Sequence, residues 1–160
     1  MVREIPGFDQ APYIGALMRM GLEVARGRIL DALAAADLGD LNLTHLGLFQ
    51  YPPIDGARPS DVAKRLRISK QALNHLLGQL ERLGYLERRS DPACRQTTVH
   101  YTERGWRVLD TTMIAMQGLE ADWQGQIGKR RFAEFKATIK ELLGVVPEAP
   151  GPAMAKSGPS

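Results

Sequence analysis

Residues 59–84 read PSDVAKRLRISKQALNHLLGQLERLG, and this stretch decides the fold. Pro59-Ser60-Asp61 is a helix-start signal with Ser60 as the N-cap, and Ser69 is a second N-cap candidate further along. Apolar residues then recur at helical spacing through residues 72–83. Gly84 is a typical glycine just beyond a helix C-terminus. The stretch therefore predicts two short helices joined by a tight turn.

The hydrophobic period changes directly after this pair of helices. Residues 85–89 and 97–101 are typical of strands, the second more clearly because it is rich in β-branched and aromatic residues. Residues 90–96 between them are polar and rich in turn formers. Two strands around such a tip predict a β-hairpin.

The chain before residue 59 predicts one long and one short helix. Apolar side chains recur at threes and fours from about Ala11 to about Ala36, which is the helical period. Thr44 is the N-cap candidate of a short helix. Two prolines and a glycine within residues 51–56 then predict a loop.

The chain after the hairpin predicts two more helices and a tail. The first starts at Thr102-Glu103 and runs to about Ile127, and Gly128 interrupts the pattern. A final helix ends at Gly144. Residues 147–160 contain four prolines and almost no large apolar side chains, so we expect this tail to be disordered.

These elements predict a mainly α fold with a small β-hairpin wing, which is a winged helix-turn-helix flanked by long N- and C-terminal helices. The chain divides into four expected parts. They are the N-terminal helix in residues 1–42, the winged lobe in residues 43–105, the C-terminal helices in residues 106–146 and the tail in residues 147–160.

The charge distribution indicates a polyanionic partner. The chain has 21 Lys and Arg against 18 Asp and Glu, a net charge of +3. Residues 57–107 hold eleven basic and five acidic side chains, a net charge of +6, so the rest of the chain carries −3. A basic middle between acidic ends favours binding to a polyanion. A solvated charged face is the alternative interpretation.

The sequence favours a cytoplasmic protein. No run approaches the roughly 20 apolar residues of a membrane span, and the first ten residues lack the apolar core of a signal peptide. The single cysteine, Cys94, excludes an internal disulfide and fits a reducing compartment.

The helix that begins at Ser69 is the candidate DNA reader. The major groove of B-form DNA is about 12 Å wide and admits one α-helix. The face opposite the apolar stripe displays Lys70, Gln71, Asn74 and His75 near the helix N-terminus. Gln and Asn pair bidentately with adenine, Lys reaches guanine acceptors, and a helix N-terminus favours phosphate. Double-stranded DNA is therefore the predicted partner.

Three further basic residues complete the predicted interface. Arg95, at the hairpin tip, is placed to enter the minor groove, where narrow A-tracts attract arginine. Arg88 and Arg89 lie at the base of the wing and alternate between the two faces of a strand, so only one of them faces DNA. We take Arg89 as that residue. Lys64 is interpreted as a phosphate contact.

The chain resembles a known family, the multiple-antibiotic-resistance regulators (MarR). The resemblance covers residues 43–105 most closely, and the flanking helices fit it in order and length. The matching residues are the Leu43-Thr44 start, Pro59-Ser60-Asp61-Val62-Ala63-Lys64-Arg65-Leu66, the Ile68-Ser69 turn, Ala72-Leu73, Leu80-Glu81-Arg82-Leu83-Gly84-Tyr85-Leu86-Glu87-Arg88 and Thr102-Glu103-Arg104-Gly105.

The resemblance implies a homodimer. In the family the first and last helices of two subunits intertwine, so residues 1–42 and 106–146 are expected to be dimerisation helices. The winged lobes then lie on successive half-sites of a pseudo-palindrome. Many members are repressors that small phenolic or lipophilic ligands release from DNA, and no cofactor is expected.

The wing tip departs from the family pattern. The family's wing usually carries an acidic residue followed by two basic ones after a proline, whereas residues 91–95 read Asp-Pro-Ala-Cys-Arg. We therefore carry over only Arg95 from the family's wing.

A set of apolar and imidazole side chains is a candidate effector cleft between the dimer helices and the winged lobe. Methionine adapts to irregular ligands, which favours this interpretation. Dimer core is the alternative for the methionines. The set is Met18, His45, Phe49, Trp106 and Met113.

Other reactive side chains carry weaker hypotheses. The three histidines, His45, His75 and His100, lie on separate elements without metal-ligand spacing, so no metal site is predicted. Titration of His75 at a phosphate surface would make DNA binding sensitive to pH. Cys94 is interpreted as an inert surface thiol, with a redox switch as the alternative.

The contrasting function classes are an enzyme and a protein-binding module. The sequence has no Gly-rich phosphate loop, no nucleophile elbow and no metal-ligand cluster, so no catalytic residue is predicted. A winged helix that binds protein instead of DNA is the alternative, because fold does not fix function. An apolar patch on the exposed face of residues 69–83 would favour that alternative.

Overall fold

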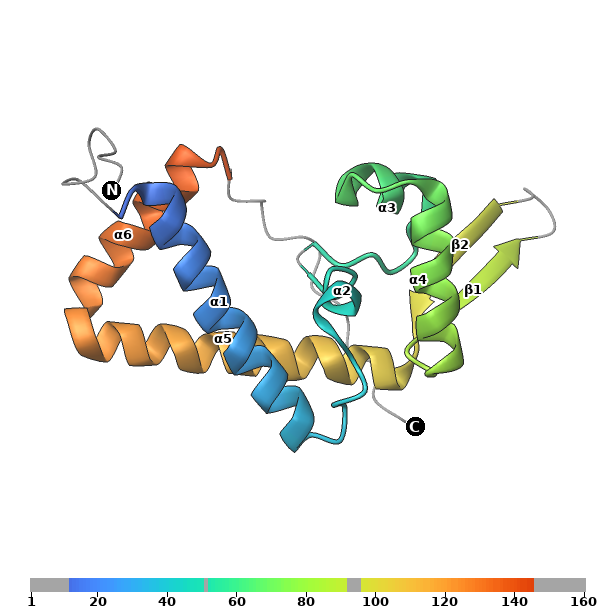
Figure 1. Ribbon diagram of the computed structural model, residues 1–160, viewed down its shortest axis with the longest axis horizontal. Coiled ribbons are helices and arrows are strands. Elements are labelled where there is room, and N and C mark those ends of the chain that lie inside the picture. The colour runs from blue at the N-terminus through green and yellow to red at the C-terminus, as the bar shows by residue number, and fades with distance from the viewer. Residues whose placement is uncertain (1–11, 51, 92–95, 146–160) are drawn as a thin grey trace, which may run out of the picture. The chain divides into compact units, whose positions relative to one another are not determined.

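The computed structural model describes residues 12–50, 52–91 and 96–145. It is mainly helical with one two-stranded antiparallel hairpin, as predicted (Figure 1). The elements are α1 (Ile14–Ala35), α2 (Leu43–Leu46), α3 (Pro59–Leu66), α4 (Lys70–Arg82), β1 (Leu86–Asp91), β2 (Gln96–Tyr101), α5 (Glu103–Ile127) and α6 (Lys129–Leu142). The chain forms two compact units, Met1–Leu119 and Glu120–Ser160, whose boundary lies inside α5.

Helices α3 and α4 form the predicted helix-turn-helix, and one of their two expected caps is confirmed. The Ser69 Oγ accepts a hydrogen bond from the backbone N–H of Ala72 at 3.0 Å. The expected cap at Ser60 is wrong, because the N-cap of α3 is Arg58, two residues earlier, and it makes no side-chain bond. Pro59 occupies the first helical position, where its fixed φ suits a helix and its missing N–H is not needed.

The turn between α3 and α4 is closed by a left-handed residue. Arg67 has φ 53° and ψ 39°, and the N–H of Ile68 donates to the Ala63 carbonyl at 3.1 Å. Because non-glycine residues adopt this conformation only singly, the chain reverses within one residue and α4 starts directly afterwards.

The short helix α2 is capped by Asn42 and not by Thr44, which corrects the sequence prediction. The Asn42 Oδ1 accepts from the backbone N–H groups of Thr44 and His45, both at 3.0 Å. In return the His45 Nδ1 accepts the Asn42 backbone N–H at 3.3 Å. This is a reciprocal capping box in which histidine takes the place usual for Glu or Gln.

The hairpin pairs Leu86 with Tyr101 at its base and Asp91 with Gln96 at its outer end. An additional antiparallel bridge joins Ala57 to Val99. The first strand starts at Leu86, one residue later than expected. The predicted tip residues 92–95, and with them Cys94 and Arg95, lie outside the described residues.

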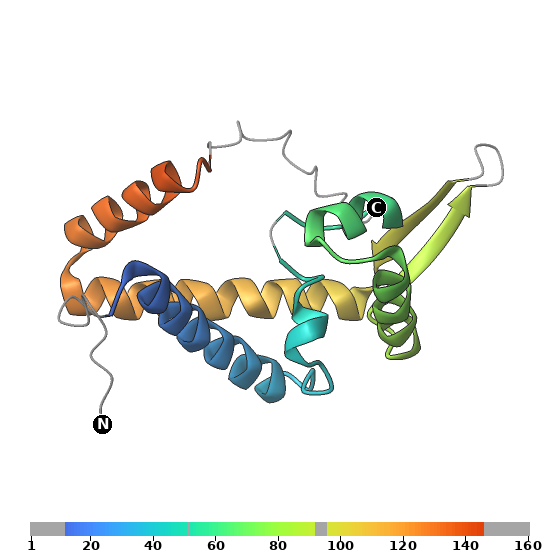
Figure 2. The ribbon, with the colours of Figure 1, turned by 45° about the horizontal axis from the view of Figure 1, so that its top comes forward.

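One hydrophobic core unites the helix-turn-helix with its neighbours in the first unit. Figure 2 shows α3, α4 and the base of the hairpin close together. The core also takes in the end of α1 and the start of α5, so the winged lobe is not a separate hydrophobic body. Its buried members are Leu33, Leu38, Leu41, Leu46, Leu48, Phe49, Ile54, Val62, Ala63, Leu73, Leu77, Leu80, Tyr85, Leu86, Val99, Tyr101 and Val108.

The junction between the hairpin and α5 requires a glycine. The Thr102 Oγ1 donates to the Gly84 carbonyl at 2.6 Å and accepts from the Gly105 N–H at 3.1 Å. A Cβ added at Gly105 would lie 2.1 Å from the Tyr85 carbonyl oxygen. Glycine therefore allows the first turn of α5 to approach the chain that leaves α4.

The second unit contains the end of α5 and α6. Gly128, with φ 87°, separates the two helices as predicted. Edge-to-face contact between Trp123 and Phe132, with ring centroids 6.4 Å apart, packs the two helices together, and Lys136 Nζ donates to Glu120 at 2.6 Å. No helix among the described residues is long and apolar enough to span a membrane.

Candidate nucleic-acid interface

Helix α4 presents one apolar and one polar face. Leu73, Leu77 and Leu80 are each at most 1% exposed and form the anchored side. The face opposite them is exposed near the helix N-terminus. The exposed polar residues there are Lys70, Gln71, Asn74 and His75, the residues that the sequence analysis assigned to DNA.

The start of α4 combines a side-chain cap with free backbone donors. The hydroxyl of Ser69 is occupied by its bond to the Ala72 N–H. The backbone N–H groups of the first turn that precede Ala72 have no intrahelical partner, because an α-helix leaves its first donors unpaired. These donors and the positive end of the helix dipole favour an anion beside Lys70.

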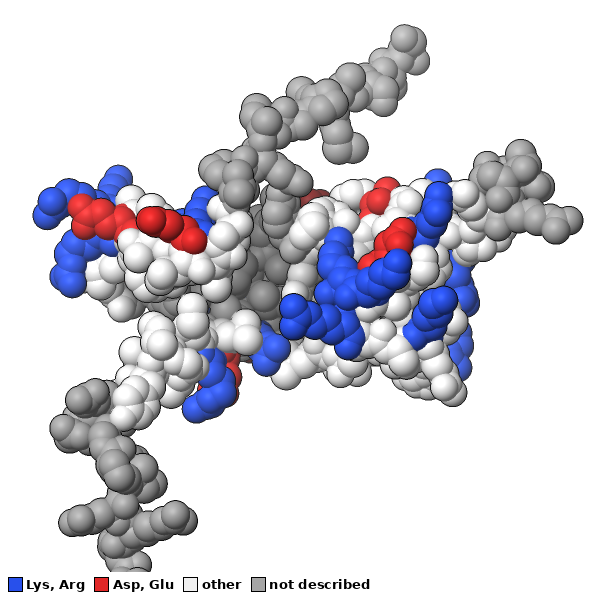
Figure 3. Space-filling model, turned by 90° about the horizontal axis from the view of Figure 1, so that it is seen from above, with Lys and Arg blue, Asp and Glu red and all other residues white. Residues whose placement is uncertain are grey.

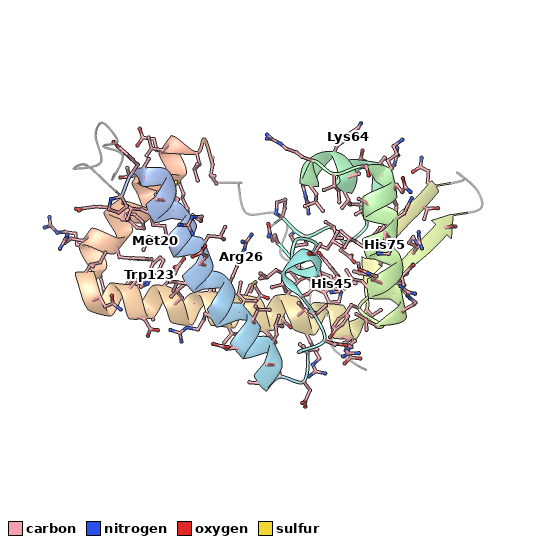
Figure 4. The ribbon with its side chains drawn as sticks, in the orientation of Figure 1. Met20, Arg26, His45, Lys64, His75 and Trp123 are labelled. Carbon is pink, nitrogen blue, oxygen red and sulfur yellow. The ribbon has the colours of Figure 1, made fainter. Side chains whose placement is uncertain are left out.

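The helix-turn-helix also carries exposed cations without ion-pair partners among the described residues. Lys64 projects from α3 into solvent (Figure 4). Figure 3 shows Lys and Arg gathered at the end of the first unit that carries α3 and α4, with a few acidic side chains among them. Four of these basic residues have no ion-pair partner among the described residues, and their charges are therefore available to phosphate. They are Arg58, Lys64, Arg67 and Lys70.

Arg88 and Arg89, at the base of the wing, have different surroundings. Arg88 donates through Nε to Glu81 Oε1 at 2.9 Å and through Nη2 to Oε2 at 2.6 Å, while its backbone N–H also donates to Glu81. This bidentate pair raises the pKa of the Arg88 guanidinium above its ordinary value, mainly through the hydrogen bond to Glu81. The side chain of Arg88 therefore braces β1 against α4.

Arg89 is the more exposed of the two arginines. Its guanidinium makes a surface pair with Glu87, Nε to Oε1 at 2.7 Å, and its side chain is 63% exposed. A surface pair of this kind contributes little stability, about 0 to 1 kcal/mol, and exchanges readily for another anion. The structure thus makes Arg89, at 63% side-chain exposure against 36% for Arg88, the more accessible of the two and the less firmly paired.

A buried tyrosine ties the C-terminal end of α4 to the segment after α1. The Tyr85 hydroxyl donates to Asp40, whose other oxygen accepts from Arg104 Nη2 at 3.0 Å. The Arg104 guanidinium also lies over the Tyr85 ring, 4.3 Å from its centroid. Burial, together with the bond to Asp40, raises the pKa of Tyr85 to about 12. Sequence reasoning did not single out Asp40, because nothing local marks it as a partner.

A second tyrosine fixes the loop before α3. The Tyr101 hydroxyl donates to the Leu48 carbonyl at 2.7 Å and accepts the Ile54 N–H at 3.1 Å. Burial is the main cause that raises the pKa of Tyr101 above its ordinary value. Asp55 accepts from the Tyr101 backbone N–H at 2.9 Å, so the loop is held against the end of β2.

Two histidines that the sequence analysis assigned to different sites are joined by one glutamine. The Nε2 of buried His45 lies 3.1 Å from Gln79 Oε1, and Gln79 Nε2 lies 3.1 Å from the Nε2 of exposed His75. Figure 4 shows His45 on α2 and His75 on α4. Gln79 was not predicted as a functional residue. Its helical spacing of four residues from His75 was the signal that the sequence contained.

The residues of the predicted effector cleft have mixed environments. Phe49 and His45 are buried, at 3% and 5% exposure. Met18, Trp106 and Met113 are exposed. Phe49 and Trp106 both contact Tyr101, with ring centroids 5.4 Å and 5.1 Å apart. The cleft therefore stays a prediction.

An apolar hollow lies in the second unit, and none of the predicted cleft residues lines it. It has a volume of about 300 Å³ and is lined by Trp123, Gln126, Ile127, Phe132 and Phe135. Within the described parts of the chain, no three His, Cys, Asp or Glu side chains form a group that could hold a metal ion.

Comparison with known proteins shows which proteins this chain is similar to. The model of the MarR family matches residues 52–95, which include α3, α4 and β1. This segment of the chain is therefore similar to the MarR family. A search of curated proteins found no match for the chain.

Solved structures share the fold of this chain across most of its length. Streptococcus pneumoniae FabT in complex with DNA has 17% identity and a TM-score of 0.67, covering 81% of this chain and 92% of FabT. The Staphylococcus aureus MepR–DNA complex has 19% identity and a TM-score of 0.61, covering 88% and 98%. The Thermotoga maritima regulator Tm0710 has 21% identity and a TM-score of 0.57, covering 82% and 92%. At these identities the likeness shows the winged helix fold.

Proposed function

We propose that this protein is a regulator of the MarR family, which controls transcription by binding a pseudo-palindromic operator in double-stranded DNA as a homodimer. One observation carries the proposal. The leading turn of α4 is exposed and polar while its opposite side is anchored in the core, and the helix-turn-helix carries exposed cations without ion-pair partners among the described residues. FabT and MepR, which share the fold, are seen in complexes with DNA.

The proposed division of labour follows from the chemistry of each side chain. Gln71 and Asn74 are the base readers, because their amides can pair bidentately with adenine. Lys64 and Arg89 contact phosphate, which fixes the position of the protein on the duplex. Arg95 enters the minor groove from the wing tip.

The proposed homodimer is supported by the apolar surface of α1. Soluble monomers rarely expose a contiguous apolar patch of this kind, so a partner is expected to cover it. A second copy of the chain would also supply the second winged lobe that a palindromic site requires. The exposed apolar residues at the start of α1 and on its surface are Tyr13, Ile14, Leu17, Met18, Met20, Leu22 and Val24.

Repression and its release by a small phenolic or lipophilic ligand form the second part of the proposal. The exposed side chains of Met18, Trp106 and Met113 support it, since such a ligand needs an adaptable apolar surface. Release of bound DNA by a panel of phenolic compounds would test it, with Met113→Arg as the variant expected to lose the response. If no compound releases DNA, regulation by such a ligand is rejected while DNA binding stands.

The alternative, a winged helix that binds protein, is less well supported. It requires an apolar patch on the exposed face of α4. Lys70, Gln71, Asn74 and His75 occupy that face instead, and each is exposed. Their hydrogen-bonding groups suit base edges and phosphate better than an apolar protein surface.

Selection of bound duplexes from a random DNA library tests the proposal directly. A regulator of this kind is expected to enrich one sequence with two-fold symmetry and half-sites about one helical turn apart. Sedimentation of the free protein and of the complex gives the number of protomers in each. Failure to enrich any sequence, with the protein folded and dimeric, would reject the DNA-binding function.

Salt dependence then tests the assignment of the cations. Affinity falls as salt rises, and each phosphate contact makes the plot of log K against log salt steeper by about 0.9. Lys64→Ala is expected to reduce the slope by about that amount for each half-site. Arg95→Ala is expected to reduce it as well. Lys136→Ala, which removes an exposed cation paired with Glu120 in the second unit, is the matched control and should leave the slope unchanged.

A further inference from the structure

A hydrogen-bonded chain runs from the N-cap of α2, through a buried histidine, to the exposed polar side of α4. It begins at the Asn42 backbone N–H, passes through His45 and Gln79, and ends at the exposed His75. His45 is 5% exposed, so its ring is held by the fold and not by solvent. The Nδ1 of His75 has no hydrogen-bond partner among the described residues. The chain therefore ends in one ring nitrogen that is open to a ligand.

Each link in this chain fixes the proton on the next. A backbone N–H can only donate, so the His45 Nδ1 that receives it carries a lone pair. Neutral His45 then carries its hydrogen on Nε2 and donates it to Gln79 Oε1. That bond sets the orientation of the Gln79 amide, because the reversed amide would place its NH₂ group against the His45 N–H.

The oriented amide decides the tautomer of His75. The Gln79 Nε2 can only donate, so the His75 Nε2 at 3.1 Å accepts and carries a lone pair. Neutral His75 must then carry its hydrogen on Nδ1. The exposed side of the ring is consequently a hydrogen-bond donor, without any need for protonation.

We propose that Gln79 is a positioning residue that holds His75 in its Nδ1–H tautomer, so that α4 presents a neutral N–H donor to an acceptor on DNA. This inference rests on the proposed DNA-binding function. The acceptors available are a phosphate oxygen or the N7 and O6 atoms on purine edges in the major groove. The Nδ1–H of the neutral ring then serves as the donor to either acceptor.

The ionisable groups around His75 leave this assignment intact. His45 of α2 is the titratable group in contact with Gln79. On α4 Glu81 is held by Arg88 of β1, and Arg82 donates to the Gly78 carbonyl at 3.2 Å. No hydrogen bond or ion pair within the described residues joins His75 to an ionisable side chain of α4 or of the packed elements α3 and β1. Those side chains are Lys70, Glu81 and Arg82 of α4, Asp61, Lys64 and Arg65 of α3, and Glu87, Arg88 and Arg89 of β1.

Nitrogen NMR of the free protein tests the tautomer without DNA. In the wild type near pH 8 we expect His75 to show a pyrrole-type Nδ1 and a pyridine-type Nε2. Gln79→Met keeps the length of the side chain but removes both bonds, so the tautomer preference should be lost. A wild-type His75 with its hydrogen on Nε2 would overturn the inference.

Gln79→Glu reverses the donor and the acceptor in the hydrogen bond between residue 79 and His75. It should give a dependence of DNA affinity on pH that would not arise if Gln79 only stabilised the fold. The carboxylate still accepts from His45, but it also requires an N–H on the His75 Nε2. Neutral His75 then presents a lone pair to DNA, whereas protonated His75 presents a donor. We expect the affinity of this variant to fall about tenfold as the pH rises from about 6 to about 8.5, while that of the wild type does not fall between about 7 and 8.5.

The double variant His75→Phe/Gln79→Glu is the matched control. It adds the same negative charge next to DNA but has no ring that titrates, so its affinity should be lower at every pH with a flat profile. A profile for Gln79→Glu that is parallel to the wild type overturns the inference while the wild type still binds DNA. If NMR shows the expected tautomer but the wild-type protein selects no DNA from the library, the proposed function is refuted instead.

Discussion

Replacing Gly78 with alanine is expected to stabilise the protein and weaken its binding to DNA. Gly78 lies seven residues after Gln71 and four before Arg82 on α4, so the three share the exposed side of the helix. A Cβ built at Gly78 has no neighbouring atom within 4 Å. The methyl group is therefore accommodated without strain. The gain from replacing a glycine inside a helix is about 0.5 to 1 kcal/mol.

The expected loss of affinity follows from the same geometry. A helix that lies in the major groove brings its exposed side against base edges and sugar–phosphate chains, and Gly78 is the one position on this stripe without a side chain. The added methyl group points into that contact. Overpacking a close contact costs about 1 to 3 kcal/mol, so affinity should fall by about fivefold or more.

Two measurements on one preparation of Gly78→Ala test the expected gain in stability and the expected loss of DNA affinity. Thermal unfolding should show a midpoint raised by a few degrees, about 2 to 4 °C per kcal/mol for a chain of this size. A fluorescence titration with the selected duplex should show the weaker binding. Gly118→Ala, on an exposed turn of α5 that also has no atom within 4 Å of the added Cβ, is the control that should stabilise without affecting DNA. Equal affinity of Gly78→Ala and wild type would refute the close approach of DNA to this face.

Three further substitutions have outcomes set by the structure. Gln71→Ala should cost about 1 to 3 kcal/mol on the selected duplex and little on unrelated duplexes, and an equal loss on all sequences in competition titrations would show that Gln71 does not read bases. Gly105→Ala should lower the free energy of unfolding in urea by about 1 to 3 kcal/mol, because its Cβ would meet the Tyr85 carbonyl oxygen at 2.1 Å; an unchanged midpoint would contradict this. The pKa of Tyr85 is about 12 in the folded protein against 10.0 when unfolded, so the fold favours the neutral phenol. This contributes about 2 to 3 kcal/mol to the free energy of unfolding below pH 10, and the contribution is lost as the pH rises from 10 to 12. Tyr85→Phe should abolish that extra loss in urea titrations above pH 10.

The elements of the fold could be predicted because their signals are local. The apolar stripe of α4, its cap at Ser69 and the interruption at Gly128 depend on residues within one or two turns of each other. Each of the two wrong caps was placed two residues too late. In each case a neighbour was better suited, Pro59 by its fixed φ and Asn42 by its reciprocal bond with His45. Local chemistry therefore located the helices but not always their first residue.

The surroundings of the candidate site could not be predicted because their partners are remote in sequence. Asp40 meets Arg104 across 64 positions, and His45 meets Gln79 across 34. Neither pair has a spacing that a helix or a hairpin would bring together. Only the packing of α2 against the core places an imidazole of that helix beside α4.

These remote partners determine which cations the interface can use. The sequence alone counts eleven basic residues in the middle of the chain, and alternation in β1 indicates that only one of Arg88 and Arg89 faces DNA, which we took to be Arg89. Glu81 distinguishes them, because it engages Arg88 through two guanidinium bonds and a backbone bond, whereas Arg89 has only a surface pair. Because Arg88 is paired with Glu81, we do not count it in the proposed interface. The polar start of α4 then retains two unpaired cations, Lys64 and Lys70. In the proposed function, acidic and amide side chains of the scaffold, and not the number of arginines, therefore define the face that α4 would offer to DNA.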